Sequence, residues 1–153
     1  MSESESKFPG RPPHAAPLWV PEAAIFHIRI RAEKSSLLTE PWLARRLLDS
    51  VEFYSEQGRW WAWIFLLMPD HLHALLSFPV EERISDVVGD WKRFHARQHG
   101  VLWQENYFDH RLRREESFAE KAAYVCANPV VKGLVASADD WPWKLVADGR
   151  QQT

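Results

Sequence analysis

The sequence has a single cysteine, Cys126, so it cannot form an internal disulfide and suits a reducing compartment. It also lacks a long apolar run, because the longest, WWAWIFLLM, is far shorter than the roughly 20 residues that cross a membrane. The N-terminal residues contain no apolar stretch of the kind that signal peptides carry. Together these absences predict a cytoplasmic protein without a membrane-spanning segment.

An excess of positive charge is missing as well. The chain has 19 Lys and Arg against 21 Asp and Glu, a formal net charge of -2, so composition alone does not indicate a nucleic-acid-binding protein. The charge is uneven, since the segment from Arg83 to Arg114 has seven basic and four acidic residues. A polyanion, if one binds, is expected to contact this central segment.

The length of 153 residues fits one domain with a sizeable core. Five of the ten prolines lie within the first 21 residues, among Ser, Glu and Gly. This composition predicts a flexible N-terminal arm over residues 1–22. Residues 23–147 are expected to form the single domain, and residues 148–153 a C-terminal tail.

Periodicity predicts the order of the elements. Alternating residues predict a strand over 24–31, and two apolar runs joined by MPD predict a hairpin of strands over 59–78. Helical spacing predicts one helix from Pro41 and another from Ile84 to near Gly100, and VLWQENYFDHRLR predicts a further strand. Ser117 and Glu120 form a capping box that starts a last helix, which Pro129 ends.

The order β-α-β-β-α-β followed by a helix predicts an α+β fold. It is the order of a ferredoxin-like antiparallel sheet with an additional C-terminal helix. That helix carries Tyr124.

Two histidines, His71 and His73, interrupt the second strand of the predicted hairpin. Because side chains alternate along a strand, both point to one face with Leu75, about 6 to 7 Å apart. Two neutral imidazoles so placed could share a divalent metal, although two ligands alone do not make a metal site. Each histidine could instead make one ordinary hydrogen bond.

The last helix offers a third ligand. If Phe118, Ala122 and Val125 form its packed stripe, Tyr124 lies more than 100° away, and Asn128 follows one turn later on the same face. A phenol can attack a phosphodiester while a cation neutralises the phosphoryl oxygens. His71, His73 and Asn128 would then hold Mg²⁺ or Mn²⁺, and Tyr124 would be the nucleophile.

The motifs MPDHLHALL, LWQENYFDHRLR, YVCANPVVKGLV and DWPWK resemble, in this order, those of the REP-associated tyrosine transposases, relatives of the single-tyrosine HUH transposases. The resemblance covers about residues 24–145. It implies a nuclease that binds a hairpin in single-stranded DNA, as monomer or homodimer, and joins its tyrosine to a 5′-phosphate. It assigns the metal to His71, His73 and Asn128, and nucleophilic attack to Tyr124.

Further residues are candidates for contact with DNA. In the DHRLR segment, the resemblance to the family signature associates Asp109, His110 and Arg113 with DNA contact or with support of the site. Basic residues could grip phosphates, although a run of charge is more often a solvated face. The basic candidates are Lys92, Arg93, Arg97, Arg111, Arg113 and Arg114.

Two other functions stay open. A metal-dependent phosphodiesterase could use the same metal to activate water, which would make Tyr124 dispensable. A DNA-binding protein could keep the fold and grip a hairpin without cutting it. A histidine-triad hydrolase is excluded, because its third histidine would fall on Leu75.

Overall fold

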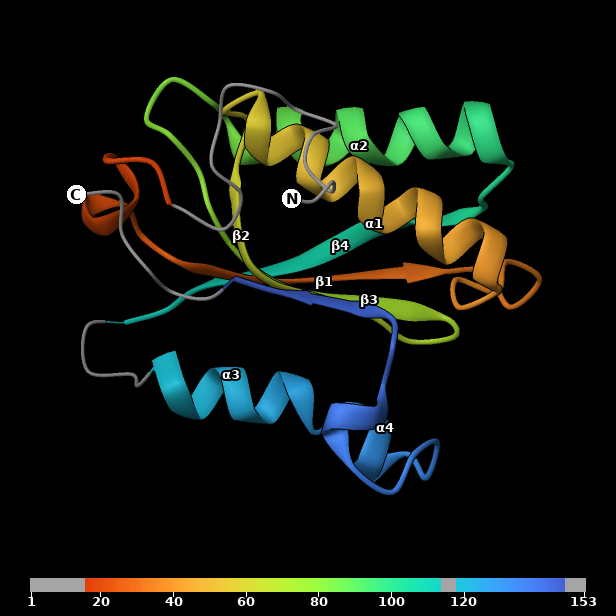
Figure 1. Cartoon of the computed structure of the whole chain (residues 1–153). Coiled ribbons are helices and arrows are strands. Elements are labelled where there is room, and N and C mark those ends of the chain that lie inside the picture. The colour runs from red at the N-terminus through yellow and green to blue at the C-terminus, as the bar shows by residue number, and fades with distance from the viewer. Residues whose placement is uncertain (1–15, 114–117, 148–153) are drawn as a thin grey trace, which may run out of the picture.

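The computed structural model describes residues 16–113 and 118–147, with helices on both faces of one sheet (Figure 1). The strands are β1 (Phe26–Ala32), β2 (Trp61–Leu67), β3 (His71–Ser77), β4 (Trp103–Arg111) and β5 (Lys144–Val146). The helices are α1 (Pro41–Glu56), α2 (Ile84–His99), α3 (Phe118–Cys126) and α4 (Asn128–Val131). Short 3₁₀ turns cover Val20–Glu22 and Ala138–Asp140. Within these ranges no helix is long and apolar enough to cross a membrane.

The sheet has the order β4-β1-β3-β2-β5, and every neighbouring pair is antiparallel. The first four strands in this order reproduce the ferredoxin-like arrangement, so the predicted α+β class is confirmed. β5 was not predicted as a strand. It pairs with the outer edge of β2 over three residues, which is too short a run to show periodicity.

Two cores form on the two faces of the sheet. α1 and α2 cover one face, and α3 and α4 cover the other (Figure 1). The larger core lies under α1 and α2 and contains Leu72, Ala74 and Leu76 of β3. The smaller core lies under α3, where Val125 and Trp141 pack with Leu75. β3 therefore contributes side chains to both cores, as alternation requires.

Local sequence explains where the main helices begin and end. α1 starts at Pro41, whose missing N–H costs nothing in the first turn, and Glu40 accepts a hydrogen bond from the Leu43 N–H at 3.1 Å. α2 ends at Gly100, whose φ of 71° lies in the left-handed region that glycine adopts without a Cβ penalty. The predicted capping Ser117 lies outside the described residues.

The structure corrects the predicted arm where it describes that segment. Ala16 and Val20 are buried against Trp61 of β2, so residues 16–22 are part of the packed domain. Burial of these apolar side chains against a tryptophan stabilises the segment despite its proline content. Residues 1–15 and the predicted tail 148–153 lie outside the described residues.

Candidate active site

His71 and His73 lie on β3 on the face that α3 covers. Alternation places them opposite Leu72 and Ala74, as the sequence predicts, and the register sets them directly across from Arg31 and Arg29 of β1. Both histidines are buried, with exposed fractions of 8% and 3%. Their ring centroids are 5.0 Å apart. Two imidazoles are thus held side by side under a helix rather than on an open surface.

Each of these histidines has its Nδ1 atom engaged. The Nδ1 of His71 lies 2.8 Å from the Oδ1 of Asp70, and the Nδ1 of His73 lies 3.0 Å from the Nε2 of His27 on β1. The His27 ring is buried and stacks on His73 at 5.2 Å with planes 21° apart. The Nε2 atoms are therefore the nitrogens of His71 and His73 that these bonds leave for a ligand.

Burial keeps these imidazoles neutral. It lowers the pKa of His73 to about 3, and neighbouring His71 and His27 add to the effect. It lowers the pKa of His27 to about 4, with Lys121 and Arg29 contributing. The pKa of His71 also falls because of burial, although Asp70 opposes the change. Neutral imidazole is the form that binds a metal, so the protonation state suits a metal site near neutral pH.

Tyr124 on α3 faces this histidine group. Its ring centroid is 6.3 Å from that of His73 and 6.4 Å from that of His27. The next residue, Val125, is fully buried in the smaller core and fixes the rotation of the helix. Tyr124 is 56% exposed, so a phenol that stands beside buried imidazoles can also be reached from solvent. The predicted offset between the packed stripe and Tyr124 brings the tyrosine to the histidines.

Asn128 has a different local setting from the one predicted. Pro129 does not stop the chain from turning helically but lies in the first turn of α4, so Asn128 begins α4 instead of ending α3. Proline is tolerated there because first-turn N–H groups have no partner within the helix. The Asn128 Nδ2 donates to the carbonyls of Tyr124 and Val125, both at 3.1 Å, which leaves the Oδ1 atom outside these bonds.

The three predicted ligands carry donor atoms of the kinds that divalent cations bind. Within residues 16–113 and 118–147 no three His, Cys, Asp or Glu side chains form a group that could hold an ion. Two Nε2 atoms and one amide oxygen are a donor set that suits Mn²⁺ at least as well as Mg²⁺. The remaining positions would be filled by water or by substrate oxygens.

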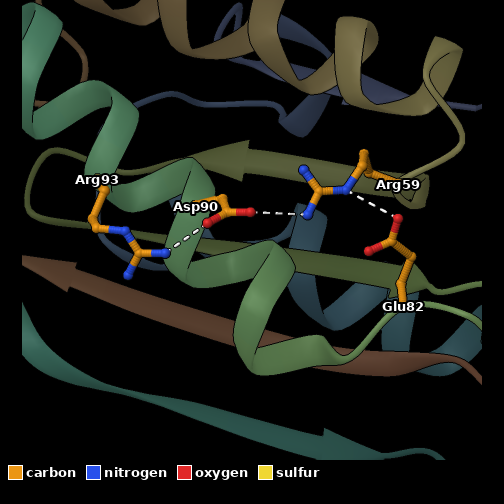
Figure 2. Close-up of polar contacts among 4 residues, drawn as sticks. All are labelled: Arg59, Glu82, Asp90 and Arg93. Atoms are coloured by element: carbon orange, nitrogen blue, oxygen red, sulfur yellow. Dashed lines mark hydrogen bonds and ion pairs between the residues drawn. The ribbon is translucent and has the colours of Figure 1, made fainter.

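The predicted DNA-contacting residues of α2 lie on the other side of the sheet from Tyr124. Lys92 donates to the carbonyls of Gln104 and Glu105, and burial lowers its pKa. Arg93 donates to Asp90 at 2.6 Å, and Asp90 also accepts from Arg59 (Figure 2). The Lys92 and Arg59 contacts tie α2 to its neighbours, whereas the Arg93 bond lies within α2. Arg97 is exposed near the end of α2.

The second set of candidates lies on β4 and just beyond it. His110 pairs in register with His27 and so points to the face of the histidines, whereas Asp109 and Arg111 pair with Ile28 and Phe26 and point to the α1 and α2 face. Arg113 follows the strand and is exposed. Arg114 lies outside the described residues.

Basic and aromatic side chains that the candidate set does not include lie closer to Tyr124. Arg29 packs its guanidinium over the ring of Phe108 at 4.9 Å, and Lys121 lies 5.7 Å from the centre of the Tyr124 ring. Arg31 lies directly across from His71 in the register of β1 on β3, and after burial its charge and that of Lys132 help to lower the pKa of His71. The alternation of His27, Arg29 and Arg31 along the first strand was the signal that could have identified part of this group.

Comparisons with known proteins find sequence relatives and a shared fold. No protein-family model matches the chain. A REP-associated tyrosine transposase of Escherichia coli (strain K12) is 26% identical over 126 residues, which are 77% of this chain and 72% of that protein. A relative from Haemophilus influenzae that carries the same family name is 26% identical over 95 residues, which are 50% of this chain and 53% of that protein.

A solved structure shares the fold. A REP-associated tyrosine transposase bound to a REP hairpin superposes with a TM-score of 0.70 and 17% identity, over 80% of this chain and 76% of that one. The five-stranded antiparallel sheet with helices on both faces is therefore the fold of that transposase. The chain is therefore similar in sequence to two REP-associated tyrosine transposases and shares the fold of a solved one.

Proposed function

We propose that the chain is a single-stranded DNA endonuclease and strand transferase that binds a hairpin and cuts beside it through Tyr124. The observation that carries the proposal is the position of Tyr124, whose exposed ring lies 6.3 Å from buried His73 on the same face of the sheet. The homologous transposases, and the hairpin bound by the solved relative, support DNA as the substrate.

A divalent cation completes the site in this proposal. The Nε2 atoms of His71 and His73 and the Oδ1 of Asn128 would hold it. When bound, Mg²⁺ or Mn²⁺ neutralises charge on the oxygens of the phosphate that is attacked. Asp70 and the Tyr124 and Val125 carbonyls keep the ligands His71 and Asn128 oriented through the bonds described above.

The cutting step is a transesterification. The phenolic oxygen of Tyr124 bonds to phosphorus and loses its proton to solvent, while the bond from phosphorus to the 3′-oxygen breaks and that oxygen takes up a proton. The products are a tyrosine joined to a 5′-phosphate and a free 3′-hydroxyl. A second 3′-hydroxyl can attack the phosphotyrosine in the reverse reaction, so strands are rejoined without an external energy source.

Charged and aromatic side chains around Tyr124 would bind the strand. Arg29, Arg31 and Lys121 supply positive charge for phosphates, and exposed Phe108 offers a face on which a base can stack. The candidates on α2, on β4 and in the sequence after β4 would contact the hairpin farther from the cut. They are Lys92, Arg93, Arg97, Asp109, His110, Arg111, Arg113 and Arg114.

The deciding experiment looks for a covalent adduct. The protein is incubated with Mn²⁺ or Mg²⁺ and a pool of single-stranded DNA hairpins with randomised flanks. The DNA is labelled at its 3′ end, because the fragment that contains this end is the one joined to Tyr124 through its 5′-phosphate. Wild-type protein is expected to give a labelled band that survives denaturant, and Tyr124→Phe none. Tyr107→Phe, on the other face of β4, is the matched control and should form the adduct.

The other outcomes separate the alternatives. Cleavage by Tyr124→Phe without an adduct would identify a phosphodiesterase that uses water. Hairpin binding by the wild type without cleavage under either metal would identify a DNA-binding protein. The double variant His71→Ala, His73→Ala should lose cleavage and keep hairpin binding, and full activity in the presence of a chelator would reject the metal site.

A further inference from the structure

His27 is a buried histidine to which the proposed reaction assigns no task. It lies on β1, next to the strand that carries His71 and His73, and it is 5% exposed. Its Nε2 atom is 3.0 Å from the Nδ1 of His73. Phe108 and Tyr124 hold its ring edge-on at 5.9 Å and 6.4 Å. The ring is therefore fixed by packing in addition to its hydrogen bond.

A hydrogen bond between two ring nitrogens needs one donor and one acceptor. If His73 is to offer the lone pair of Nε2 to a cation, its single proton must be on Nδ1. That proton then points at the Nε2 of His27, which must accept it. The position of the proton on His27 thereby follows as well, on Nδ1.

We propose that His27 is a positioning residue that accepts the Nδ1 proton of His73 and so fixes the tautomer and orientation in which His73 can bind a divalent metal. Asp70 has the same task for His71, at 2.8 Å. The two histidines of the pair thus have different supports, a carboxylate from the preceding residue and an imidazole from the neighbouring strand. This inference rests on the proposed metal site.

The first measurement uses the metal-free protein. Long-range ¹⁵N–¹H spectra of the full chain with ¹⁵N-labelled histidine report which ring nitrogen of His73 carries the proton. The expected state is Nδ1–H in the wild type. An Nε2–H tautomer for His73 would overturn the proposal, whether or not the protein cuts DNA.

The second measurement is Mn²⁺ affinity, followed by the electron paramagnetic resonance signal of free Mn²⁺. His27→Phe keeps an aromatic ring but removes the acceptor, and should weaken binding by about 10- to 100-fold. His27→Gln can place an amide oxygen near the position of Nε2 and should stay close to wild type. His99→Gln, which removes a histidine on the opposite layer, is the control and should bind as the wild type does.

The possible Mn²⁺ affinities have different meanings for the role of His27. Wild-type affinity in His27→Phe would show that His73 needs no acceptor. Affinity as low in His27→Gln as in His27→Phe would show that the imidazole itself is required, as for a direct ligand. If the wild type binds Mn²⁺ but forms no DNA adduct, the proposed function fails, while the role of His27 is still decided by the tautomer of His73 and by the Mn²⁺ affinities of the variants. If the wild type binds no Mn²⁺, the metal site fails and the proposed role of His27 in metal binding fails with it. If His27→Phe does not fold, the tautomer of His73 and the affinity of His27→Gln decide.

Discussion

A histidine far from Tyr124 should make the stability of the protein depend on pH. His95 on α2 is fully buried, with its Nε2 2.7 Å from the Oγ of Ser50 and its Nδ1 2.9 Å from the Nδ1 of His99. Burial lowers the pKa of His95 to about 3, and the charge of His99 adds to the effect. In the unfolded chain the same imidazole has its ordinary pKa of about 6.5.

The sign and size of the effect follow from these two values. Between pH 6.5 and about 3 the unfolded chain binds a proton at His95 that the folded chain does not bind. The free energy of unfolding therefore falls as the pH falls through this range. At about pH 5, one and a half units below the unfolded pKa, His95 alone should cost about 2 kcal/mol relative to neutral pH.

Urea unfolding at about pH 7.5 and pH 5 measures this cost. His95→Gln keeps an amide that can bond to Ser50 but cannot take up a proton. Its free energy of unfolding should fall by about 2 kcal/mol less than that of the wild type over this interval. The other buried histidines, His27 and His73, act in both proteins and cancel in the difference. An equal fall in both proteins would refute the reasoning, because His95 would then be protonated within the fold.

Three further substitutions test the fold and the surface. Trp141→Phe removes an indole N–H that donates to the buried Leu67 carbonyl at 2.9 Å, and should cost about 1–3 kcal/mol in urea unfolding. Gly100→Ala meets no atom within 4 Å, so its expected loss of about 1 kcal/mol in thermal unfolding comes from the left-handed backbone alone. Arg29→Gln should reduce the slope of log hairpin affinity against log salt concentration by about 0.7, because one phosphate contact is lost. Arg45→Gln on α1 is the control and should keep the wild-type slope. Equal slopes for both variants would show that the DNA strand does not pass Arg29.

The parts of the fold that follow from local rules could be predicted. Alternation along a strand has a period of two, so it placed His71 and His73 on one face without knowledge of the neighbouring strands. Helical spacing around Val125 likewise set Tyr124 apart from the packed stripe. These patterns depend only on residues close in sequence.

The parts that depend on pairing across the sheet could not be predicted. The bond between His27 and His73 joins residues 46 positions apart, and only the register of β1 on β3 brings them together. The contact of Val20 with Trp61 depends in the same way on how side chains settle in three dimensions. Composition described Val20 as part of a flexible arm, because it does not contain this information.

The residues that complete the smaller core are synthesised after the residues of the candidate active site. Tyr124 is held toward the histidines by residues that follow it in the chain, because Trp141 packs in the core of Val125 and β5 closes the edge of β2. While the chain leaves the ribosome, both histidines and the tyrosine emerge before these anchors exist. A nascent chain that ends at Asn128 contains every group the proposed cutting step needs, but not the contacts that bring them together. Synthesis itself thus delays assembly of the candidate active site until β5 is in place.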